Sequence, residues 1–533
     1  MMQQRPVNLA HILEHAARVH GYQEIVSNTV EGGLHRYTYR EALSRSKQLA
    51  NALAAFGVSP GDRLATLAWN GYRHFEVWYA VAGQSLVCHT LNPRLSPEQL
   101  AYIINHAGDR VIFVDLPLIS LLEEIAEQLT SVEAYVVLTD REHMPESSLP
   151  NLLCYEEMLG AHRDDFVWPE IAEQTSSSLC YTSGTTGDPK GVLYSHRSNL
   201  LHAYATVGGN CFGLSNATTA LMVVPMFHAN SWGLVYSAPM VGAKLVLPGS
   251  RLDGSAIQQL IESEAVTFSA GVPTVWTNLL IYLKESGKGL GGLAEVAVGG
   301  AAVPRSMIAA FRKNYGVNVL HAWGMTESSP LGTINRLPAI ADTWSEDERC
   351  DYACKQGQPL FGVELALAGE DGERLPHDGG TQGRLLMRGP WVIERYYGNQ
   401  GTALLEDDWF DTGDIATIDT YGVMQIKDRA KDVIKSGGEW ISSVDLENAA
   451  MGHSEVELAA VIAMPDPKWQ ERPMLIVKPL AGCKPDKDDI RNLLGQQFPA
   501  WWLPDKIEYV DDIPLTSTGK LDKKAMRQQH LAG

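Results

Sequence analysis

Apolar and polar residues near the N-terminus alternate first with a period typical of a helix and then with one typical of a buried strand. Thr38 is followed three residues later by Glu41, a pair that predicts a capped helix start, and the apolar spacing continues this helix to Gly57. Residues 63–68 then predict a strand. This part of the chain therefore predicts helices and strands that alternate along the sequence.

The same alternation recurs further along the chain. Residues 295–298 and 317–322 predict strands, and the segment between them predicts a helix that follows Pro304 and ends at Gly316. A strand, a helix and a second strand at this spacing imply parallel sheets with both faces covered, and ligands of such folds collect at the carboxyl ends of the strands. We therefore expect an α/β fold whose large N-terminal domain contains parallel-rich αβα sheets.

The pattern changes after about residue 360, where short strands are separated by turns. Residues 383–388 and 422–427 predict such strands and indicate a smaller β-rich subdomain. The following run, residues 427–432, is charged and carries no core pattern, which favours a hinge.

The remaining residues predict a separate small domain. Residues 457–464 and 474–477 predict strands and residues 488–498 a helix, enough for an independent α+β domain of roughly 100 residues. We therefore expect a large domain over residues 1–428 and a small, mobile C-terminal domain over residues 429–533.

The composition fits a multidomain enzyme and argues against two other classes of protein. The chain has 533 residues, 45% of them hydrophobic, which is enough for a substantial core. Its longest apolar runs are far shorter than the ~20 residues of a membrane-spanning helix, so no integral membrane association is expected. The formal net charge of -20 argues against nucleic-acid binding, which draws its affinity from clustered Lys and Arg. Neither end shows a targeting signal, so the cytoplasm is the expected location.

Seven cysteines, an odd and dispersed set, indicate a reduced interior and not a disulfide framework. Cys350 and Cys354 alone invite a metal interpretation. No partner pair of Cys or His lies near them in the sequence, so two neighbouring thiols are the favoured interpretation.

The strongest chemical signal is a loop at residues 182–191 that follows a predicted strand at residues 177–181. It holds three glycines and four hydroxyl side chains. Glycines let backbone N–H groups converge, hydroxyls donate further hydrogen bonds, and Lys190 adds a positive charge, a combination suited to a triphosphate. It is not a Walker A loop, because Lys190 is followed by Gly191 where that motif has Ser or Thr. A phosphate-binding loop is therefore favoured over a flexible surface turn.

Four ordered motifs resemble those of the adenylate-forming superfamily of acyl-CoA synthetases, luciferases and peptide-synthetase adenylation domains. Residues 182–191 read TSGTTGDPKG, similar to its signature loop, and residues 321–327 read HAWGMTE, similar to its second ATP motif. Residues 409–414 (WFDTGD) resemble the ribose motif, and residues 514–520 (PLTSTGK) resemble the terminal lysine motif. The similarity runs over almost the whole chain and implies ATP, Mg2+ and CoA as cofactors or co-substrates.

By this resemblance, Thr326 faces phosphate, Thr182 and Glu327 serve the metal, Trp323 stacks on adenine, and Asp414 accepts the ribose hydroxyls. Taken alone, Glu327 would be a solvated loop acid and Trp323 a core residue. The nucleotide-binding and CoA-binding set implied by the resemblance is Thr182, Ser183, Gly184, Thr185, Thr186, Lys190, Gly300, Ala301, Ala302, His321, Trp323, Gly324, Met325, Thr326, Asp414, Arg429, Lys431, Lys435 and Trp440.

The resemblance also gives Lys520 a role that its position near the C-terminus would not suggest. It implies that Lys520 enters the site during adenylation and stabilises the charge that builds as a carboxylate attacks the α-phosphate. Asp428 matches the hinge position, about which the small domain rotates to withdraw Lys520. The rotation then presents Lys435 and Trp440 for thioester formation.

Residues 225–233 lie where relatives line the acyl pocket, and they are mostly apolar. His228 is expected beside the reacting carboxylate, and Trp232 and Gly324 along the acid, although a lone His on an apolar segment is also typical of a core residue. Amino-acid-activating relatives require an Asp near Phe227 that binds the α-amino group of the substrate. No such Asp is obvious in this sequence, so an acid with an uncharged tail fits better. The expected catalytic set is Lys520, Thr326, Glu327 and His228.

The acid itself stays open between two branches of the family. Residues 435–443 resemble fatty acyl-CoA synthetases, and the overall pattern, including residues 272–276, also resembles 3-methylmercaptopropionate-CoA ligases. The alternatives to an acyl-CoA synthetase are an adenylation enzyme that loads a carrier protein and a non-catalytic nucleotide sensor. Relatives commonly pair through the large domain, so a homodimer is expected by resemblance.

Overall fold

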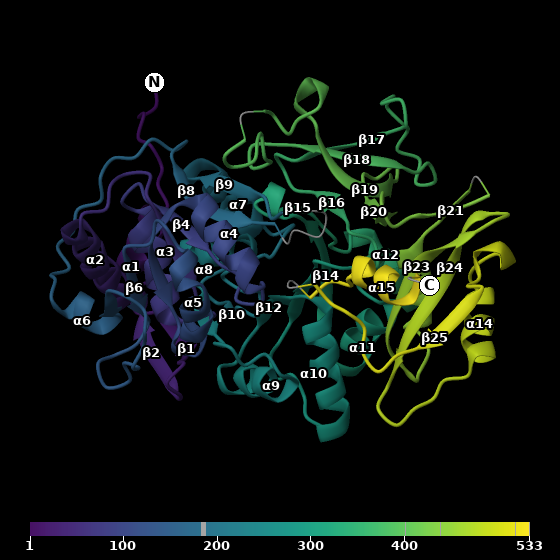
Figure 1. The fold of residues 1–533 in the computed structure, drawn as a ribbon. Coiled ribbons are helices and arrows are strands. Elements are labelled where there is room, and N and C mark those ends of the chain that lie inside the picture. The colour runs from purple at the N-terminus through teal and green to yellow at the C-terminus, as the bar shows by residue number, and fades with distance from the viewer. Residues whose placement is uncertain (183–187, 400, 438, 517–518, 532–533) are drawn as a thin grey trace.

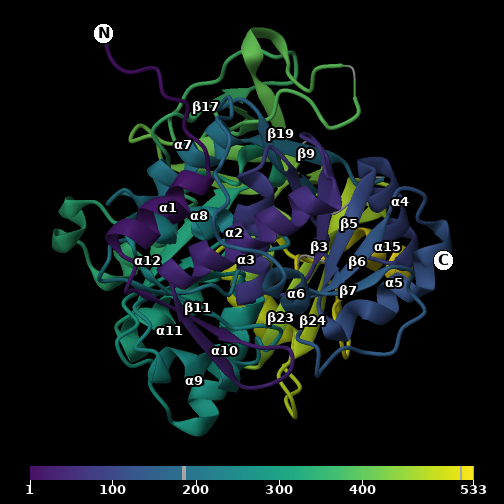
Figure 2. The same cartoon turned by 90° about the vertical axis from the view of Figure 1, so that its left-hand side faces the viewer.

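Among the described residues, seven strands of the N-terminal part form a mostly parallel sheet covered by helices on both faces (Figures 1 and 2). The structure is a computed structural model that describes residues 1–182, 188–399, 401–437, 439–516 and 519–531. The strands, in sheet order, are β7 (Leu152–Cys154), β6 (Ala134–Val137), β5 (Asp109–Val114), β3 (Arg63–Leu67), β4 (Val87–Thr90), β8 (Ser176–Tyr181) and the antiparallel β9 (Gly191–Ser195). Apolar side chains of α4 (Pro97–Ala107) and α5 (Ile119–Ile125) cover one face, and those of α2 (Tyr39–Phe56) and α3 (Tyr72–Ala82) cover the other. The short helix α6 (Tyr155–Gly160) follows β7.

A second sheet, of nine strands in the described residues, stands beside the first. Its order is β16 (Gln358–Pro359), β15 (Leu331–Ile334), β14 (Asn318–Gly324), β13 (Glu295–Val298), β12 (Phe268–Gly271), β10 (Thr219–Leu221), β11 (Lys244–Leu247), β1 (Glu24–Asn28) and β2 (Leu34–Thr38). One face is covered by α9 (Gly254–Ser263), α10 (Pro273–Ser286) and α11 (Arg305–Tyr315). The helices α1 (Ala10–Val19), α7 (His196–Val207) and α8 (Leu234–Val241) join α2 and α3 in one hydrophobic cluster that includes strands of both sheets. The helix α12 (Glu346–Ala353) precedes β16.

Local sequence signals explain several of these boundaries. The Thr38 hydroxyl accepts a hydrogen bond from the Glu41 amide, the Glu41 carboxylate accepts one from the Thr38 amide, and Gly57 ends α2 in the left-handed conformation. The strands β13 and β14 are parallel neighbours joined by α11, so the predicted strand, helix and strand unit is confirmed. The predicted α/β class with parallel-rich sheets is therefore correct.

The β-rich subdomain is a four-stranded antiparallel sheet within the described residues, drawn in green in Figure 1. Its strands are β17 (Glu364–Ala368), β18 (Gly383–Arg388), β19 (Phe410–Ile418) and β20 (Met424–Arg429). The expected strand at residues 422–427 begins two residues later, because Gly422 has a φ of 76° and belongs to the turn before β20.

The C-terminal part folds around its own sheet, drawn in yellow-green on the right of Figure 1. The strands are β22 (Glu439–Ile441), β21 (Ile434–Ser436), β24 (Gln470–Pro479), β23 (Val456–Asp466) and β25 (Lys506–Tyr509). Apolar residues of α13 (Ser443–Ala450) and α14 (Lys487–Gly495) pack on one face, and α15 (Lys523–Leu531) packs on the other. This is the expected α+β arrangement.

The interpretation of residues 427–432 as a charged run without core character is wrong at Asp428, which is fully buried. Its Oδ2 accepts hydrogen bonds from the Ser443 amide (2.7 Å) and hydroxyl (2.6 Å). Lys523 donates to the same hydroxyl and forms a 2.7 Å ion pair with Glu447, which is also buried. A buried carboxylate is stable here because every charge has a partner, and no local pattern of residues records partners 15 and 95 positions away. Burial raises the pKa of Asp428 and Glu447, and the Lys523 ammonium opposes that rise.

No helix in the described part of the chain is long and apolar enough to cross a membrane.

The buried Lys523 cluster predicts a large stability effect. We expect Lys523→Met to lower the free energy of unfolding by about 3–5 kcal/mol, because breaking a buried ion pair leaves carboxylates without a partner. Urea unfolding, combined with hydrogen exchange of the α13 and β23 amides, measures the loss. Lys524→Met, at the exposed neighbouring position, is the control and should change stability little. Equal stability of the two variants would contradict the role given to this cluster.

Candidate active site

The carboxyl ends of β12, β13 and β14 open onto a cavity of about 1900 Å3 that also contacts the C-terminal part of the chain. Val272, Gly299 and Trp323, at or next to the ends of these strands, line it, as does Thr182 after β8. A ligand site at the carboxyl edge of parallel strands is the arrangement that α/β folds favour.

Most of the residues singled out from the sequence meet in this cavity. Those that line it are Thr182, Lys190, His228, Trp232, Gly300, Ala301, Ala302, His321, Trp323, Gly324, Met325, Thr326, Glu327, Asp414, Arg429, Lys431 and Lys520. Ser183, Gly184, Thr185 and Thr186 lie outside the described residues. Lys435 and Trp440 do not line the cavity; they face each other across the β21–β22 hairpin of the C-terminal part.

Glu327 lies in a short 3-10 turn (Thr326–Ser328) directly after β14, and only 8% of it is exposed. Its Oε1 accepts a 2.9 Å hydrogen bond from the Tyr396 hydroxyl, and the Tyr396 ring lies 4.9 Å from the Lys190 ammonium. Burial and the Glu327 charge raise the pKa of Tyr396, which keeps its hydroxyl a donor. Tyr396 therefore links the carboxylate after β14 to the lysine of the glycine-rich loop.

Sequence reasoning missed Tyr396, which lines the cavity about 70 positions from Glu327. It follows three residues after the buried Ile393, whose amide donates to the Glu327 carbonyl oxygen. An aromatic residue in a loop carries no signal of its own, so only the folded chain shows this partner.

Asp414 on β19 is 3% exposed and already holds two donors. Its Oδ2 accepts a 3.0 Å hydrogen bond from the Trp323 indole nitrogen, and its Oδ1 lies 3.0 Å from Arg429 Nε. Burial raises the pKa of Asp414, opposed mainly by Arg429. Each carboxylate oxygen accepts more than one hydrogen bond, so this geometry leaves capacity for hydroxyl ligands. It also fixes the orientation of the Trp323 ring.

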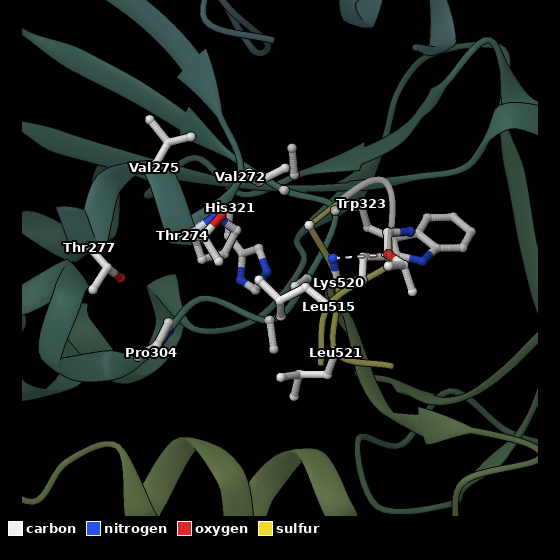
Figure 3. A pocket seen from close by; sticks show the side chains of 18 of the residues that line it. Val272, Thr274, Val275, Thr277, Pro304, His321, Trp323, Leu515, Lys520 and Leu521 are labelled. Atoms are coloured by element: carbon white, nitrogen blue, oxygen red, sulfur yellow. Dashed lines mark hydrogen bonds between the residues drawn. The ribbon is translucent and has the colours of Figure 1, made fainter. Parts of the chain in front are cut away.

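Lys520 lines the cavity, and its carbonyl oxygen accepts a hydrogen bond from the Thr516 amide at 2.7 Å. Figure 3 shows the lysine between Trp323 on one side and Val272 and Thr274 on the other. Burial, and next the charge of Arg429, lower the pKa of Lys520 to about 8, while Asp414 and Glu327 oppose the shift. The amine is therefore largely protonated at neutral pH.

His228 and Trp232 line the cavity, and an unusual backbone segment begins directly after His228. Residues 229–232 all have positive φ values between 42° and 54°, and Gly233 follows with a φ of 81°. Left-handed backbone costs non-glycine residues roughly 1–2 kcal/mol each, so the surrounding structure must hold this turn. Burial, and next the Lys520 charge, lower the pKa of His228 to about 4, so its imidazole is neutral at physiological pH.

Comparison with known proteins identifies the family. The family model described as "AMP-binding enzyme" matches residues 13–397, and the model described as "AMP-binding enzyme C-terminal domain" matches residues 445–520. The chain therefore belongs to the AMP-binding enzyme family, and the resemblance to adenylate-forming enzymes is confirmed.

Curated relatives match over nearly the whole length. The chain is 47% identical to the 3-methylmercaptopropionyl-CoA ligase of Ruegeria lacuscaerulensis, covering 99% of this chain and 98% of the relative. It is 46% identical to the medium-chain-fatty-acid–CoA ligase of Ectopseudomonas oleovorans, with 99% and 97% covered. It is also 46% identical to the long-chain-fatty-acid–CoA ligase of Thermus thermophilus, with 99% and 96% covered.

Solved structures agree on the fold. An anthranilate CoA ligase in complex with anthranoyl-AMP superimposes with a TM-score of 0.88 at 24% identity, covering 99% of this chain and 98% of that one. A benzoate CoA ligase from Burkholderia xenovorans gives a TM-score of 0.84 at 22% identity, with 98% and 100% covered. At these identities the likeness establishes the architecture alone.

The contacts of Tyr396 predict an effect on ATP use. We expect Tyr396→Phe to lower kcat/KM for ATP by about tenfold, because a hydrogen bond to a charged group contributes about 1.5–3 kcal/mol. Tyr396→Leu should lower it further, since it also removes the ring from Lys190. Steady-state kinetics with varied ATP measure both effects.

The neighbouring tyrosine supplies a matched control. The Tyr397 hydroxyl donates to the Ala107 carbonyl oxygen at 3.2 Å, and Tyr397 is not among the residues that line the cavity. Tyr397→Phe should leave kcat/KM for ATP within about twofold. The same loss in both variants would mean that the Tyr396 hydroxyl has no specific role.

Proposed function

We propose that the protein is an AMP-forming acyl-CoA synthetase that activates a carboxylic acid with ATP and transfers the acyl group to CoA. The observation that carries this proposal is the meeting, in one cavity, of Lys520 from the C-terminal part with Glu327 and Asp414 from the large domain. The CoA-ligase names of relatives that match nearly the whole chain support the same chemistry. A carrier-protein-loading enzyme finds no support among these relatives.

In the first half-reaction, a carboxylate oxygen of the acid attacks the α-phosphorus of ATP, the bond to the β-phosphate oxygen breaks, and pyrophosphate leaves. Negative charge builds on the α-phosphate oxygens, and the Lys520 ammonium is placed to stabilise it. Asp414 would accept the ribose hydroxyls, and Lys190 would bind phosphate oxygens. The pKa of His228 lies near 4, so its imidazole is uncharged at neutral pH. The acid's carboxylate would therefore form no ion pair with His228 and would stay available as the nucleophile.

The residues that line the cavity suit the binding of Mg2+ together with ATP. The described residues contain no group of three acidic, His or Cys side chains that could hold a metal by themselves. Mg2+ prefers one or two carboxylates together with phosphate oxygens and water, so the single Glu327 carboxylate, with the Thr182 hydroxyl nearby in the cavity, suits a metal that arrives with ATP. When bound, the ion would neutralise phosphate charge.

In the second half-reaction, the CoA sulfur attacks the acyl carbonyl carbon, and AMP leaves with the bonding electron pair. We propose that the small domain, residues 429–533, rotates about Asp428 between the two steps. The position of Asp428 near the end of β20 supports this. So does the lining of the cavity, which includes Lys520 but neither Lys435 nor Trp440. Rotation would withdraw Lys520 from the cavity and bring Lys435 and Trp440 toward it.

We further propose an acid with an uncharged short to medium-length tail. Phe227, Trp232 and Val272 give the acid side of the cavity an apolar lining. The relatives named above act on 3-methylmercaptopropionate and on medium-chain and long-chain fatty acids. A cytoplasmic location and a homodimer, both expected from the sequence, stay predictions.

A panel of acids tests the function. Purified protein with ATP, Mg2+, CoA and acids of three to sixteen carbons, 3-methylmercaptopropionate included, should release AMP and form acyl-CoA with at least one acid. Coupled AMP detection and mass spectrometry of the thioester measure the two products. Acyl transfer to a phosphopantetheinyl carrier protein in preference to CoA would support the alternative enzyme, and no AMP with any acid would refute adenylation.

The charge of Lys520 predicts a pH dependence. Because its pKa is lowered to about 8, the ammonium is lost as pH rises through that value, and kcat/KM for ATP in pyrophosphate release should fall above about pH 8. Lys520→Ala should lower adenylation by about 100- to 1,000-fold and abolish this fall. ATP binding to Lys520→Ala, measured by calorimetry, should stay within a few-fold of wild type. Unchanged pyrophosphate release would refute the role of Lys520.

A further inference from the structure

A buried amide and hydroxyl network holds the left-handed turn that follows His228. Asn230, within the turn, is 1% exposed and does not line the cavity. Its Nδ2 donates to Asn199 Oδ1 at 2.9 Å, and its Oδ1 accepts from the Ser178 hydroxyl at 3.3 Å. Both polar ends of the side chain therefore have partners away from the cavity.

The network continues from the turn to a helix and a strand. Asn199, on α7 and also 1% exposed, donates through Nδ2 to the hydroxyls of Ser177 and Ser178, each at 3.1 Å. Ser177 and Ser178 lie on β8, the strand that leads to the glycine-rich loop. The turn is thus anchored to the same strand that presents Thr182 to the cavity.

Other contacts hold the ends of the turn. The Ser231 hydroxyl donates to the Val224 carbonyl oxygen at 2.9 Å. Gly233 packs closely against His202, since a Cβ at Gly233 would lie 2.6 Å from His202 Nδ1. Asn also adopts positive φ more readily than most residues, so Asn230 suits the turn through both its backbone and its amide.

Within this turn, Ala229 and Trp232 line the cavity, and Trp232 contributes the large side chain. The Trp232 ring packs on the Gly299 backbone, because a Cβ built on Gly299 would lie 3.1 Å from Trp232 Cη2. The ring therefore lies against the turn that follows β13, where both residues line the cavity. Its direction depends on the left-handed backbone, since a change in φ at Trp232 would turn the side chain away.

We propose that Asn230 and Asn199 are positioning residues that set the acid chain-length preference by fixing Trp232 through the left-handed turn. This inference rests on the proposed acyl-CoA synthetase activity. Neither residue lines the cavity. Loss of the network lets Trp232 leave its place on Gly299, which deepens the acid side of the cavity and favours longer acids.

Two substitutions of Asn230 separate the amide from the backbone. Asn230→Ala loses the hydrogen bonds and the tolerance of positive φ, whereas Asn230→Gly loses only the hydrogen bonds. For both variants, the ratio of kcat/KM for a long acid to that for a short acid should rise by about tenfold or more, because both buried hydrogen bonds of Asn230 are lost. Asn199→Ala, which leaves the turn's own sequence intact, should shift the ratio in the same direction.

The KM for ATP distinguishes a positioning role of Asn230 and Asn199 from a general loss of structure in the variants. KM for ATP should stay within about twofold of wild type, because Asn230 and Asn199 do not line the cavity. Asn151→Ala is the matched control: Asn151 also has a positive φ (51°), donates to the Glu133 carbonyl oxygen, and lies outside the residues that line the cavity. It should leave the acid profile unchanged.

Each outcome decides a different question. If wild-type protein forms no AMP with any acid, the proposed function fails. If wild type is active and Asn230→Gly and Asn199→Ala keep its acid profile, the inference fails although the function stands. Should Asn230→Ala not fold, as judged by thermal unfolding, Ser178→Ala removes one of the two hydrogen bonds of Asn230 and should give a smaller shift toward long acids. A wild-type profile for Ser178→Ala would then overturn the inference.

Discussion

The site depends on one electrostatic arrangement, in which the Lys520 amine from the C-terminal part lies among the Asp414 and Glu327 carboxylates and the Arg429 guanidinium. Burial and the Arg429 charge disfavour the charged amine, whereas the two carboxylates favour it. The resulting pKa of about 8 keeps Lys520 largely protonated at neutral pH. Asp414 is itself fixed by Trp323 and Arg429. A movement of the C-terminal part relative to the large domain would therefore change the interactions of Lys520 with all of these groups together.

Much of the fold follows from local sequence. The Thr38 capping box, Gly57 and Gly316 set helix ends through contacts within five residues, so these ends are predictable. The glycine-rich loop, Glu327, Asp414 and Lys520 were recognised because the motifs that carry them are contiguous, and the structure brings the described ones into one cavity. A contiguous motif predicts site residues well because the functional side chain and the turn that positions it lie in the same short stretch of sequence.

The features that sequence reasoning missed depend on distant partners. The burial of Asp428 depends on Ser443, which donates to its carboxylate and accepts from Lys523, and Tyr396 reaches Glu327 across about 70 positions. Asn230 is one polar residue in an apolar segment, and its partner lies 31 positions earlier on a helix. Hydropathy patterns record which face a residue occupies and carry no information about which buried donor meets which acceptor. These contacts therefore had to come from the folded chain.

The left-handed turn and the buried Asp428 carboxylate persist for the same physical reason. Four non-glycine residues with positive φ are costly, and so is a carboxylate without water, yet both persist because several hydrogen bonds converge on each. Both features reach the cavity, the turn through Trp232 and β20 through Asp428. In the proposed cycle, Asp428 would act as the hinge and Trp232 as a wall beside the acid, so the small domain would move as a unit while Trp232 stays in place. Flexibility would then be confined to the backbone after Asp428, and the selectivity for the acid would be decided before that movement.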